Sequence, residues 1–458
     1  METKTLFVII SKDIIRRNIF DTAFWDTLIA KKDSWRVVLV VENEKVAWYQ
    51  ERVGDTAEVV GYARAPHKGW AKVVNFLVRS AGNTHSMRTY RNRALKRGQS
   101  SFASYCVKAC IANVLGGVSW YQGFVRYLVQ HLPNNKTIGD LYVQYKPNLV
   151  FAPSLIDNDF DVLFGVESRR RNIPVVGMVR SWDNLNNHGL LAFIPDELIL
   201  QNKWLKESGE RYQSIDFGET PHTISGLPHY DRYEDLTGML LPREEFFNSL
   251  ALDPHKKLIF LAGFDFYYSE DTLPGVVDKL VENGKIEGDV QILFTQHPAS
   301  LYTKEDYRID ELKNVVYLNL FAGKPMGFMD TEQTFINIAY YADVIVNVAS
   351  TVAIDAAVLD KPVVCIGFDD PQKNLSRWEE VGRLHDHFDH YEHLHETGAT
   401  SIARSPEELA EQINQYLASP AHNHEGRMRA REEFVAPFDG RAGERVATAV
   451  LRHMARIR

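Results

Sequence analysis

The sequence has few cysteines, no long apolar run and no excess of positive charge. Its three cysteines, Cys106, Cys110 and Cys365, are too few for a secreted disulfide framework, and we interpret them as buried free thiols in a reducing cytoplasm. No stretch approaches the length of a membrane-spanning helix, and the apolar run near the N-terminus is too short for a signal peptide. A formal net charge of -8 argues against general nucleic-acid binding. We therefore expect a cytoplasmic protein that does not bind nucleic acid.

What the sequence does contain is a series of short apolar runs that alternate with helical segments. The predicted strands, most of them such runs, cover residues 6–10, 37–41, 149–152, 175–179, 198–200 and 222–225, and then 258–262, 290–295, 315–318, 344–348, 363–367 and 399–403. Such a pattern predicts parallel sheets with helices on both faces. We expect two α/β domains, residues 1–235 and 236–432. Residues 70–145 are read as a helical insertion in the first, and residues 433–458 as a helix that packs back on it.

The carboxyl ends of the predicted strands in the second half carry candidate phosphate ligands. Ser350 and Thr351 open the predicted helix 352–359, where unpaired backbone N–H groups favour an anion, although an ordinary helix cap is an equal alternative. Asp355 follows one helical turn later, where its carboxylate could accept from a ribose or base, or simply be solvated.

Two further strand ends in the second half belong to the same predicted site. Gly263 follows strand 258–262, and its missing side chain would let a ligand approach the backbone. His297 and Pro298 follow strand 290–295, where an imidazole can hydrogen-bond a phosphate or carry a proton. Together with the helix start, these positions form a predicted donor-binding site.

The first half carries a second group of polar residues at strand ends. Ser11 follows the first strand directly, and Arg16, Arg17 and Asn18 lie on an expected single helix over residues 14–30. Another polar loop follows strand 175–179, with Trp182, Asp183, Asn184 and His188. Because open α/β sheets bind ligands at this edge, we expect an acceptor site with Asp183, and secondly His188, as the proton acceptor. The alternatives are surface charge for the arginines and a turn or cap for Asp183 or Asn184.

Two charged stretches have simpler explanations beside their functional ones. The predicted helical insertion has a basic cluster that is either a solvated face or a surface that meets an anionic acceptor, a lipid pyrophosphate or the acidic inner face of a membrane: Arg88, Arg91, Arg93, Lys96 and Arg97. Residues 385–395 contain five histidines, but no strand-held carboxylate frames them, so we predict no native metal site there.

The motifs resemble a known family. Three elements carry the resemblance: Ala342-Asp343-Val344 with Ser350-Thr351 and Asp355, then Asp360-Lys361-Pro362-Val363, and the His297-Pro298 pair. They are similar to the nucleotide-binding motifs of CDP-glycerol glycerophosphotransferase-like enzymes, and the His-Pro pair also to bacterial transferases that use CMP-sugars. Ser181-Trp182-Asp183-Asn184 and Gly226-Leu227-Pro228 with Asp231 resemble surface-polysaccharide members of this group.

The resemblance implies a GT-B fold, with two Rossmann-like domains facing across a cleft, and a nucleotide-activated donor as substrate. By it, His297, Ser350 and Thr351 would hold the donor phosphates. The family's Trp-His-Gly-like element is replaced here by Trp182-Asp183-Asn184, with His188-Gly189 displaced, so sugar transfer is favoured over glycerophosphate transfer. We expect a metal-independent glycosyltransferase without a cofactor, acting on a glycan or lipid-linked glycan. The alternatives are a CDP-glycerol-type glycerophosphotransferase, a nucleotide-sugar 2-epimerase and a non-catalytic GT-B-like subunit.

Overall fold

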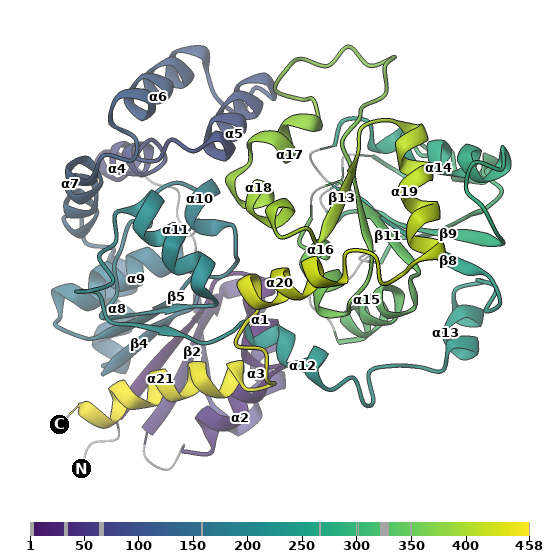
Figure 1. Ribbon diagram of the computed structural model, residues 1–458. Helices are drawn as coiled ribbons and strands as arrows, with labels where there is room; N and C mark the ends of the chain where they lie inside the picture. Colours follow the sequence, from purple (N-terminus) through teal and green to yellow (C-terminus); the bar gives the residue numbers. More distant parts are fainter. Residues whose placement is uncertain are drawn as a thin grey trace. The chain divides into compact units, whose positions relative to one another are not determined.

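The computed structural model describes residues 4–31, 35–63, 68–156, 159–264, 267–298, 300, 302–320, 329–348 and 350–457. The chain forms two compact units (Figure 1). Unit 1 consists of residues up to Glu234 together with those from Ala436 onward, and unit 2 runs from Asp235 to Val435. Each unit is built on its own parallel sheet, so the predicted α/β class with two Rossmann-like domains is confirmed.

Unit 1 has a seven-stranded sheet of order β3-β2-β1-β4-β5-β6-β7, and every neighbouring pair is parallel. The strands are β1 (Lys4–Ile10), β2 (Trp35–Glu42), β3 (Glu58–Tyr62), β4 (Leu149–Ala152), β5 (Val175–Met178), β6 (Glu197–Leu200) and β7 (His222–Ile224). Leu6 pairs with Val37 on one side and with Leu149 on the other, which makes β1 an interior strand of the sheet. The sequence prediction missed β3, an edge strand whose apolar run is only two valines long before Gly61.

Outside residues 70–145, the described helices of unit 1 are α1 (Asp13–Ile19), α2 (Ala23–Ile29), α3 (Val46–Val53), α9 (Asp159–Arg170), α10 (Asn184–Asn187), α11 (Lys203–Gln213), α12 (Asp231–Glu234) and α21 (Ala442–Arg456). The expected single helix over residues 14–30 is wrong. It breaks between α1 and α2, where Thr22 leaves the helical conformation and its hydroxyl accepts a capping hydrogen bond from the Phe24 amide at 3.3 Å.

Residues 70–145 form five helices in the described part of unit 1, as the predicted helical insertion requires. They are α4 (Trp70–Val78), α5 (His85–Lys96), α6 (Phe102–Leu115), α7 (Ser119–Gln130) and α8 (Lys136–Tyr145). Hydrogen bonds hold them to the loop around α10 and to α11: Thr84 donates to the Asn186 carbonyl, Gln122 to the Tyr212 carbonyl and Arg126 to the Leu191 carbonyl. The insertion is therefore fixed to the loop that carries the predicted proton acceptors.

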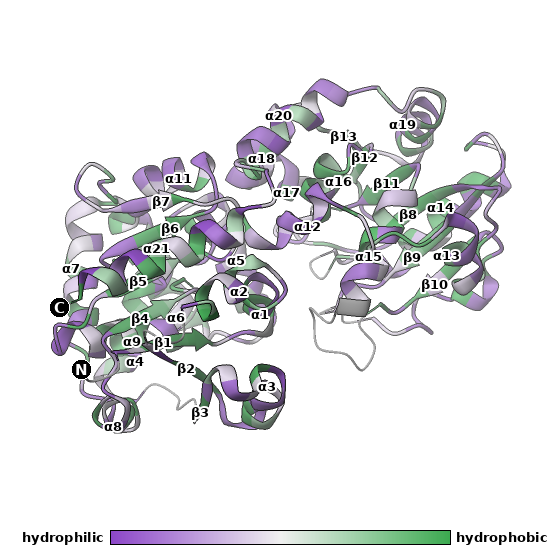
Figure 2. Cartoon of the chain, turned by 90° about the horizontal axis from the view of Figure 1, so that it is seen from below, coloured by the Kyte–Doolittle hydropathy of each residue, from purple (hydrophilic) through white to green (hydrophobic). Residues whose placement is uncertain are grey.

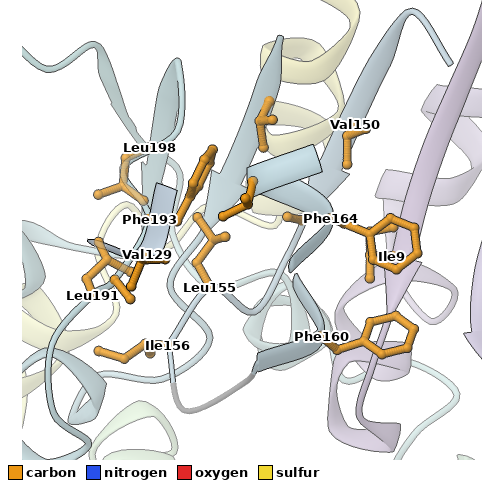
Figure 3. Packing of buried hydrophobic residues seen from close by; sticks show 14 of the residues in the cluster. Ile9, Val129, Val150, Leu155, Ile156, Phe160, Phe164, Leu191, Phe193 and Leu198 are labelled. Atoms are coloured by element: carbon orange, nitrogen blue, oxygen red, sulfur yellow. The ribbon is translucent and has the colours of Figure 1, made fainter. Parts of the chain in front are cut away.

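The core of unit 1 joins the sheet to these helices (Figure 3). Phe164 and Phe193 pack beside strand residues such as Val150 and Leu198, and Val129 of α7 belongs to the same cluster. Each large aromatic side chain of this kind buries a large apolar area. The hydropathy colouring shows the same division, with apolar strands inside each unit and mixed helices around them (Figure 2).

The C-terminal helix α21 completes unit 1. The Asp231 carboxylate accepts hydrogen bonds from the amides of Ala442 and Gly443 at 2.9 and 2.8 Å, which satisfies two N–H groups at the start of α21. A Cβ on Gly226 would lie 2.6 Å from the Pro437 carbonyl oxygen, so only glycine fits there. The motif from Gly226 to Asp231 thus packs against the start of the C-terminal helix and caps it. At the far end of this helix Lys4 donates to the Ile457 carbonyl, which brings the two termini together.

Unit 2 has a six-stranded parallel sheet of order β10-β9-β8-β11-β12-β13. The strands are β8 (Lys257–Ala262), β9 (Val290–Thr295), β10 (Val315–Leu318), β11 (Val344–Asn347), β12 (Val363–Ile366) and β13 (Thr400–Ala403), each within a residue or two of its predicted limits. The helices are α13 (Arg243–Ser249), α14 (Leu273–Glu282), α15 (Met329–Tyr341), α16 (Val352–Val358), α17 (Gly382–His387), α18 (Asp389–Glu396), α19 (Pro406–Ala418) and α20 (His424–Phe434). Within the described ranges, no helix is both long and apolar enough to cross a bilayer.

Candidate functional site

The strand order of unit 2 reverses direction between β8 and β11. The chain runs outward from β8 through β9 to β10, and then returns to the other side of β8 to build β11, β12 and β13. Ligands of open α/β sheets bind at such a switch point, outside the carboxyl ends of the strands. Gly263, His297 and Ser350 follow the ends of β8, β9 and β11, three adjacent strands. The sequence-predicted donor residues are therefore brought to one edge of the sheet.

Gly263 is packed tightly by its own unit. A Cβ at this position would lie 2.3 Å from the Glu270 Oε1 atom and 2.8 Å from the His297 backbone nitrogen. Its amide donates to the Thr295 carbonyl at 2.8 Å, which continues the β8–β9 pairing beyond the strands. The small residue is thus required by the close approach of protein atoms, and its role toward a ligand stays a prediction.

His297 is a neutral, partly exposed side chain. Burial lowers the pKa of its imidazole to about 4, so the ring is uncharged at neutral pH. The edge of the ring lies against Phe264, with 6.4 Å between centroids, and the His297 carbonyl accepts from the Ser300 amide. Pro298 follows as an exposed residue. A neutral imidazole can donate one N–H to a phosphate oxygen without first losing a proton.

Ser350 and Thr351 precede the first residue of α16, and their hydroxyls have different surroundings. The Ser350 Oγ atom accepts from the Val352 amide at 3.3 Å, as in an ordinary turn at a helix start. Thr351 is exposed, and its side chain makes no capping hydrogen bond. Asp355 is buried, which excludes the solvated-carboxylate alternative for it.

A polar network beside His297 was missed by the sequence analysis. Glu270 is buried; its Oε1 atom accepts from the Phe264 amide at 2.9 Å, and its Oε2 atom accepts from the Ser300 hydroxyl at 2.7 Å. Ser300 also contacts the Tyr307 hydroxyl at 2.9 Å. This network fixes the loops after β8 and β9. Its only sequence signal was the density of Ser, Glu and Tyr after two strand ends.

Two carboxylates of the family-like motif have structural partners. Asp343 lies at the amino end of β11, where it accepts from the Leu258 amide and from Lys257, both at 2.8 Å. Asp360 has a positive φ of 55° and accepts from Arg427 at 2.7 Å and His424 at 2.9 Å. These aspartates tie β8 to β11 and α16 to α20, away from the carboxyl edge of the sheet.

In unit 1, Asp183 lies just beyond the carboxyl end of β5, at the start of α10. Its carboxylate accepts hydrogen bonds from the side-chain amides of Asn184 and Asn187, so two neighbouring asparagines orient it. Trp182 is buried, and its carbonyl accepts from the Trp204 indole at 3.1 Å. His188 follows α10, with its ring 6.1 Å from that of Tyr90. The four predicted loop residues are thus held in one short, well-anchored turn.

The residues after β1 have a different environment. Arg16 is buried and pairs with Asp21 at 3.5 Å, and Asp21 also pairs with Arg52 and Arg232. Ser11 and Asn18 are buried as well, whereas Arg17 is half-buried. The surface-charge alternative is therefore wrong for Arg16, which belongs to a buried ion cluster around Asp21.

The basic cluster of the insertion does not form one continuous face. Arg93 is buried, Arg88 and Arg91 are half-buried and both donate to Asn83, and Lys96 and Arg97 are exposed. Nor do all three thiols lie inside the fold, since Cys106 and Cys110 are exposed and only Cys365 is buried.

The histidine-rich stretch contains a hydrogen-bonded chain between elements. His385 Nε2 lies 2.8 Å from the Ile366 carbonyl, His385 Nδ1 lies 3.0 Å from His395 Nε2, and His395 Nδ1 lies 2.6 Å from the Thr400 hydroxyl. Burial lowers the pKa of His385 to about 4 and that of His395 to about 3. Neutral rings fit this chain, because each can donate through one nitrogen and accept through the other. In the part of the chain that the structure describes, no group of metal-ligating side chains is found.

Comparison with solved structures defines the class of fold. Staphylococcus aureus MnaA solved with UDP superposes with a TM-score of 0.54 at 10% identity, covering 99% of this chain and 97% of that one. A putative UDP-N-acetylglucosamine 2-epimerase from Listeria monocytogenes gives 0.57 at 10% identity, with 99% and 97% covered. A glycosyltransferase from Rickettsia africae gives 0.52 at 10% identity, with 99% and 100% covered. The chain therefore has the GT-B fold.

Part of the chain also matches the model of one protein family. Residues 277–452 match the model described as CDP-Glycerol:Poly(glycerophosphate) glycerophosphotransferase. The match begins in α14, includes His297, Ser350, Thr351 and Asp355, and ends in α21. No curated protein matches the chain. The resemblance to this family is thus confirmed over the region of the candidate donor site, and it supports a nucleotide-sugar glycosyltransferase or glycerophosphotransferase.

Proposed function

We propose that this protein is a glycosyltransferase that moves a sugar from a nucleotide-activated donor of the CMP, CDP or UDP type to a bacterial surface-glycan acceptor. The observation that carries the proposal is His297, a neutral imidazole at the end of β9 beside the switch point of unit 2. It lies inside the region that matches a family of nucleotide-dependent transferases.

On the donor side, the bond from the anomeric carbon to the nucleotide phosphate breaks, and negative charge grows on the leaving phosphate. His297 would donate an N–H to this phosphate, and the hydroxyls of Ser350 and Thr351 would add further hydrogen bonds. Donors held in place before the reaction stabilise developing charge without reorganisation. The Glu270–Ser300 network supplies that rigidity on the β8–β9 side.

On the acceptor side, Asp183 would remove the proton of the acceptor hydroxyl while the oxygen of that hydroxyl bonds to the anomeric carbon of the sugar. Asn184 and Asn187 orient the carboxylate for this task. General-base catalysis of this kind contributes about 10²- to 10⁴-fold to a rate. His188, at the end of the same turn, is the second candidate base.

We propose that no metal ion takes part, because side-chain donors are available for the leaving phosphate. Activity should then persist after extensive dialysis against EDTA. Loss of activity that is restored by Mg²⁺ or Mn²⁺ alone would contradict this part of the proposal.

Glycerophosphate transfer is the second candidate, and the family match over residues 277–452 favours it. A panel of labelled UDP-sugars, CMP-sugars and CDP-glycerol, each supplied with a membrane extract as acceptor, distinguishes sugar transfer from glycerophosphate transfer. Transfer of the label from a nucleotide sugar to the extract supports the proposed glycosyltransferase, whereas consumption of CDP-glycerol with release of CMP supports the glycerophosphotransferase. Conversion of UDP-N-acetylglucosamine to its 2-epimer without any acceptor would instead indicate an epimerase.

We also propose a peripheral membrane contact through the insertion, as a lipid-linked acceptor would require. The support is its surface: Phe102, Val114, Trp120 and Tyr127 are all more than half exposed. Apolar and aromatic side chains beside basic ones are typical of interfacial helices. Sedimentation with phosphatidylglycerol vesicles tests the contact, and a Phe102→Ser, Trp120→Ser variant that sediments as well as wild type would refute it.

A further inference from the structure

A cavity of about 320 Å³ opens in unit 1 between α5, α6 and the turn after α10. Three cationic side chains reach it from three helices or their ends, Arg79 after α4, Arg91 on α5 and Lys108 on α6. His188 and Asn187 close it from the side of the predicted acceptor loop. The packing of α5 on both α6 and α10 holds these walls together (Figure 1).

The three cations have neutral partners within the described residues. Arg79 donates to the Asn75 side chain at 3.1 Å, and Arg91 donates to the Gly82 carbonyl at 3.3 Å and to Asn83 at 3.0 Å. The Lys108 ammonium lies over the Phe76 ring at 5.2 Å. Residues 68–139 contain 11 lysines and arginines but not one aspartate or glutamate. The positive charge of the cavity is therefore not neutralised from within its own segment.

The cations also repel one another. Burial lowers the pKa of Lys108, and the charges of Arg79 and Arg91 lower it further. Burial likewise lowers the pKa of Arg91, with a further contribution from Arg88. Holding like charges together costs free energy that a bound anion would recover.

The cavity adjoins the proposed base. Asn187, whose amide donates to the Asp183 carboxylate, is part of its lining. The Tyr90 and Tyr105 rings add apolar surface, and pockets of this size hold a small organic ligand rather than a lone ion. Three cations match the double charge of a phosphate monoester better than the single charge of a carboxylate.

We propose that this cavity binds a phosphate ester carried by the acceptor, with Arg79, Arg91 and Lys108 holding the phosphate beside His188. That the bound phosphate belongs to the acceptor rests on the proposed function. That the cavity binds an anion is inferred from the residues that line it, independently of that function. The acceptor hydroxyl would then approach Asp183 from a position fixed by its own phosphate.

Calorimetry on the full chain with glycerol 3-phosphate as the probe tests the site. Lys108→Met keeps the side-chain length and removes one charge of the cavity, and Lys72→Met removes one exposed charge of α4 outside the lining as a matched control. We expect the Kd to rise at least about tenfold in Lys108→Met and to change less than about twofold in Lys72→Met. Arg79→Met is a second test variant if Lys108→Met has a lower thermal unfolding midpoint.

Four results would overturn the anion site. They are no binding at millimolar probe, equal binding by Lys108→Met and wild type, an equal loss in Lys72→Met, or tighter binding of glucuronate than of glycerol 3-phosphate. His297→Ala should leave probe binding intact, and Lys108→Met should leave nucleotide binding intact. If glycerol 3-phosphate binds in a Lys108-dependent way but no nucleotide binds, the anion site is supported and the proposed transferase function is contradicted. A failure of the anion site can therefore be told apart from a failure of the proposed function.

Competition by phosphatidic acid vesicles identifies the source of the phosphate. If the vesicles compete with glycerol 3-phosphate for the wild type, the phosphate belongs to a lipid. If they do not, it belongs to a soluble or glycan phosphate, and the anion site is supported in both cases.

Discussion

Asp183 and His188 lie in the same turn, but their surroundings suit them to different tasks. Asp183 is oriented by two asparagine amides, which fixes the direction in which its carboxylate can take a proton. His188 lines the cationic cavity, where a positive imidazole would add to the repulsion. The primary base in this account is therefore Asp183, and His188 acts as a neighbour of the bound anion.

Asp183→Asn should lower kcat by about 10²- to 10⁴-fold while KM for the donor changes little, because the variant keeps its shape but loses the basic oxygen. Steady-state kinetics with the active donor measures both. Asp140→Asn is the control, since Asp140 is an exposed carboxylate on α8 of the same unit. Equal kcat values for Asp183→Asn and the control would exclude Asp183 as the base.

Gly263→Ala and Gly275→Ala form a matched pair in unit 2. At Gly263 the new methyl group would overlap Glu270 and the His297 backbone, so we expect a loss of about 1–3 kcal/mol in the free energy of unfolding and weaker nucleotide binding. At Gly275, on α14, the nearest atom is 3.8 Å away, and alanine should stabilise the helix by about 0.5–1 kcal/mol. Urea unfolding measures both changes, and a loss of the same size at the two positions would contradict the tight packing at Gly263.

At the scale of the elements, the histidine chain links α17 and α18 to the edge of the unit 2 sheet. His385 reaches the last residue of β12, and His395 reaches Thr400 at the start of β13. Because both rings must stay neutral, the folded state binds protons less readily than the unfolded chain. Their contribution to stability is complete above the unfolded histidine pKa of about 6.5 and is lost as the pH falls toward 4.

For His385 alone, this linkage should cost about 2 kcal/mol between pH 7 and pH 5. We expect His385→Asn to destabilise the protein at pH 7, and the gap in unfolding free energy between wild type and variant to narrow as the pH is lowered. Urea unfolding at pH 7, 6 and 5 measures it. A gap that stays constant across this range would show that His385 does not resist protonation.

The elements also show where sequence reasoning succeeds and fails. Every described strand except β3 could be predicted to within a residue or two, in most cases because a run of consecutive apolar residues needs burial on both faces. The break between α1 and α2 could not. Asp21 sits at that break to meet Arg52 and Arg232, which are far away along the chain, and such long-range partners leave no local pattern.

The candidate site shows the same limit. Strand-end position located Gly263, His297 and Ser350, because parallel strands bring their carboxyl ends to one edge. The sequence alone did not distinguish Asp343 and Asp360, whose hydrogen bonds hold elements of unit 2 together, from residues at the carboxyl edge of the sheet. Nor could it find the cationic cavity, because its lining residues on α5 and α6, after α4 and around the end of α10 are brought together only by the fold.

On the scale of the whole molecule, the account assigns donor binding to unit 2 and acceptor chemistry to unit 1. The GT-B fold is shared by transferases and epimerases, so the fold alone does not choose between them. The choice rests on what binds at the switch point of unit 2 and on which group accepts the sugar.

Nucleotide binding is the most direct test of this account. Calorimetric titration of wild type with CMP, CDP, UDP and GDP should give micromolar binding of one nucleotide. His297→Ala should weaken that binding at least about tenfold, and His422→Ala, an exposed histidine of the same unit, should leave it unchanged. Failure of all four nucleotides to bind, or equal binding by the two variants, would contradict the donor site and leave a non-catalytic GT-B-like subunit as the better description.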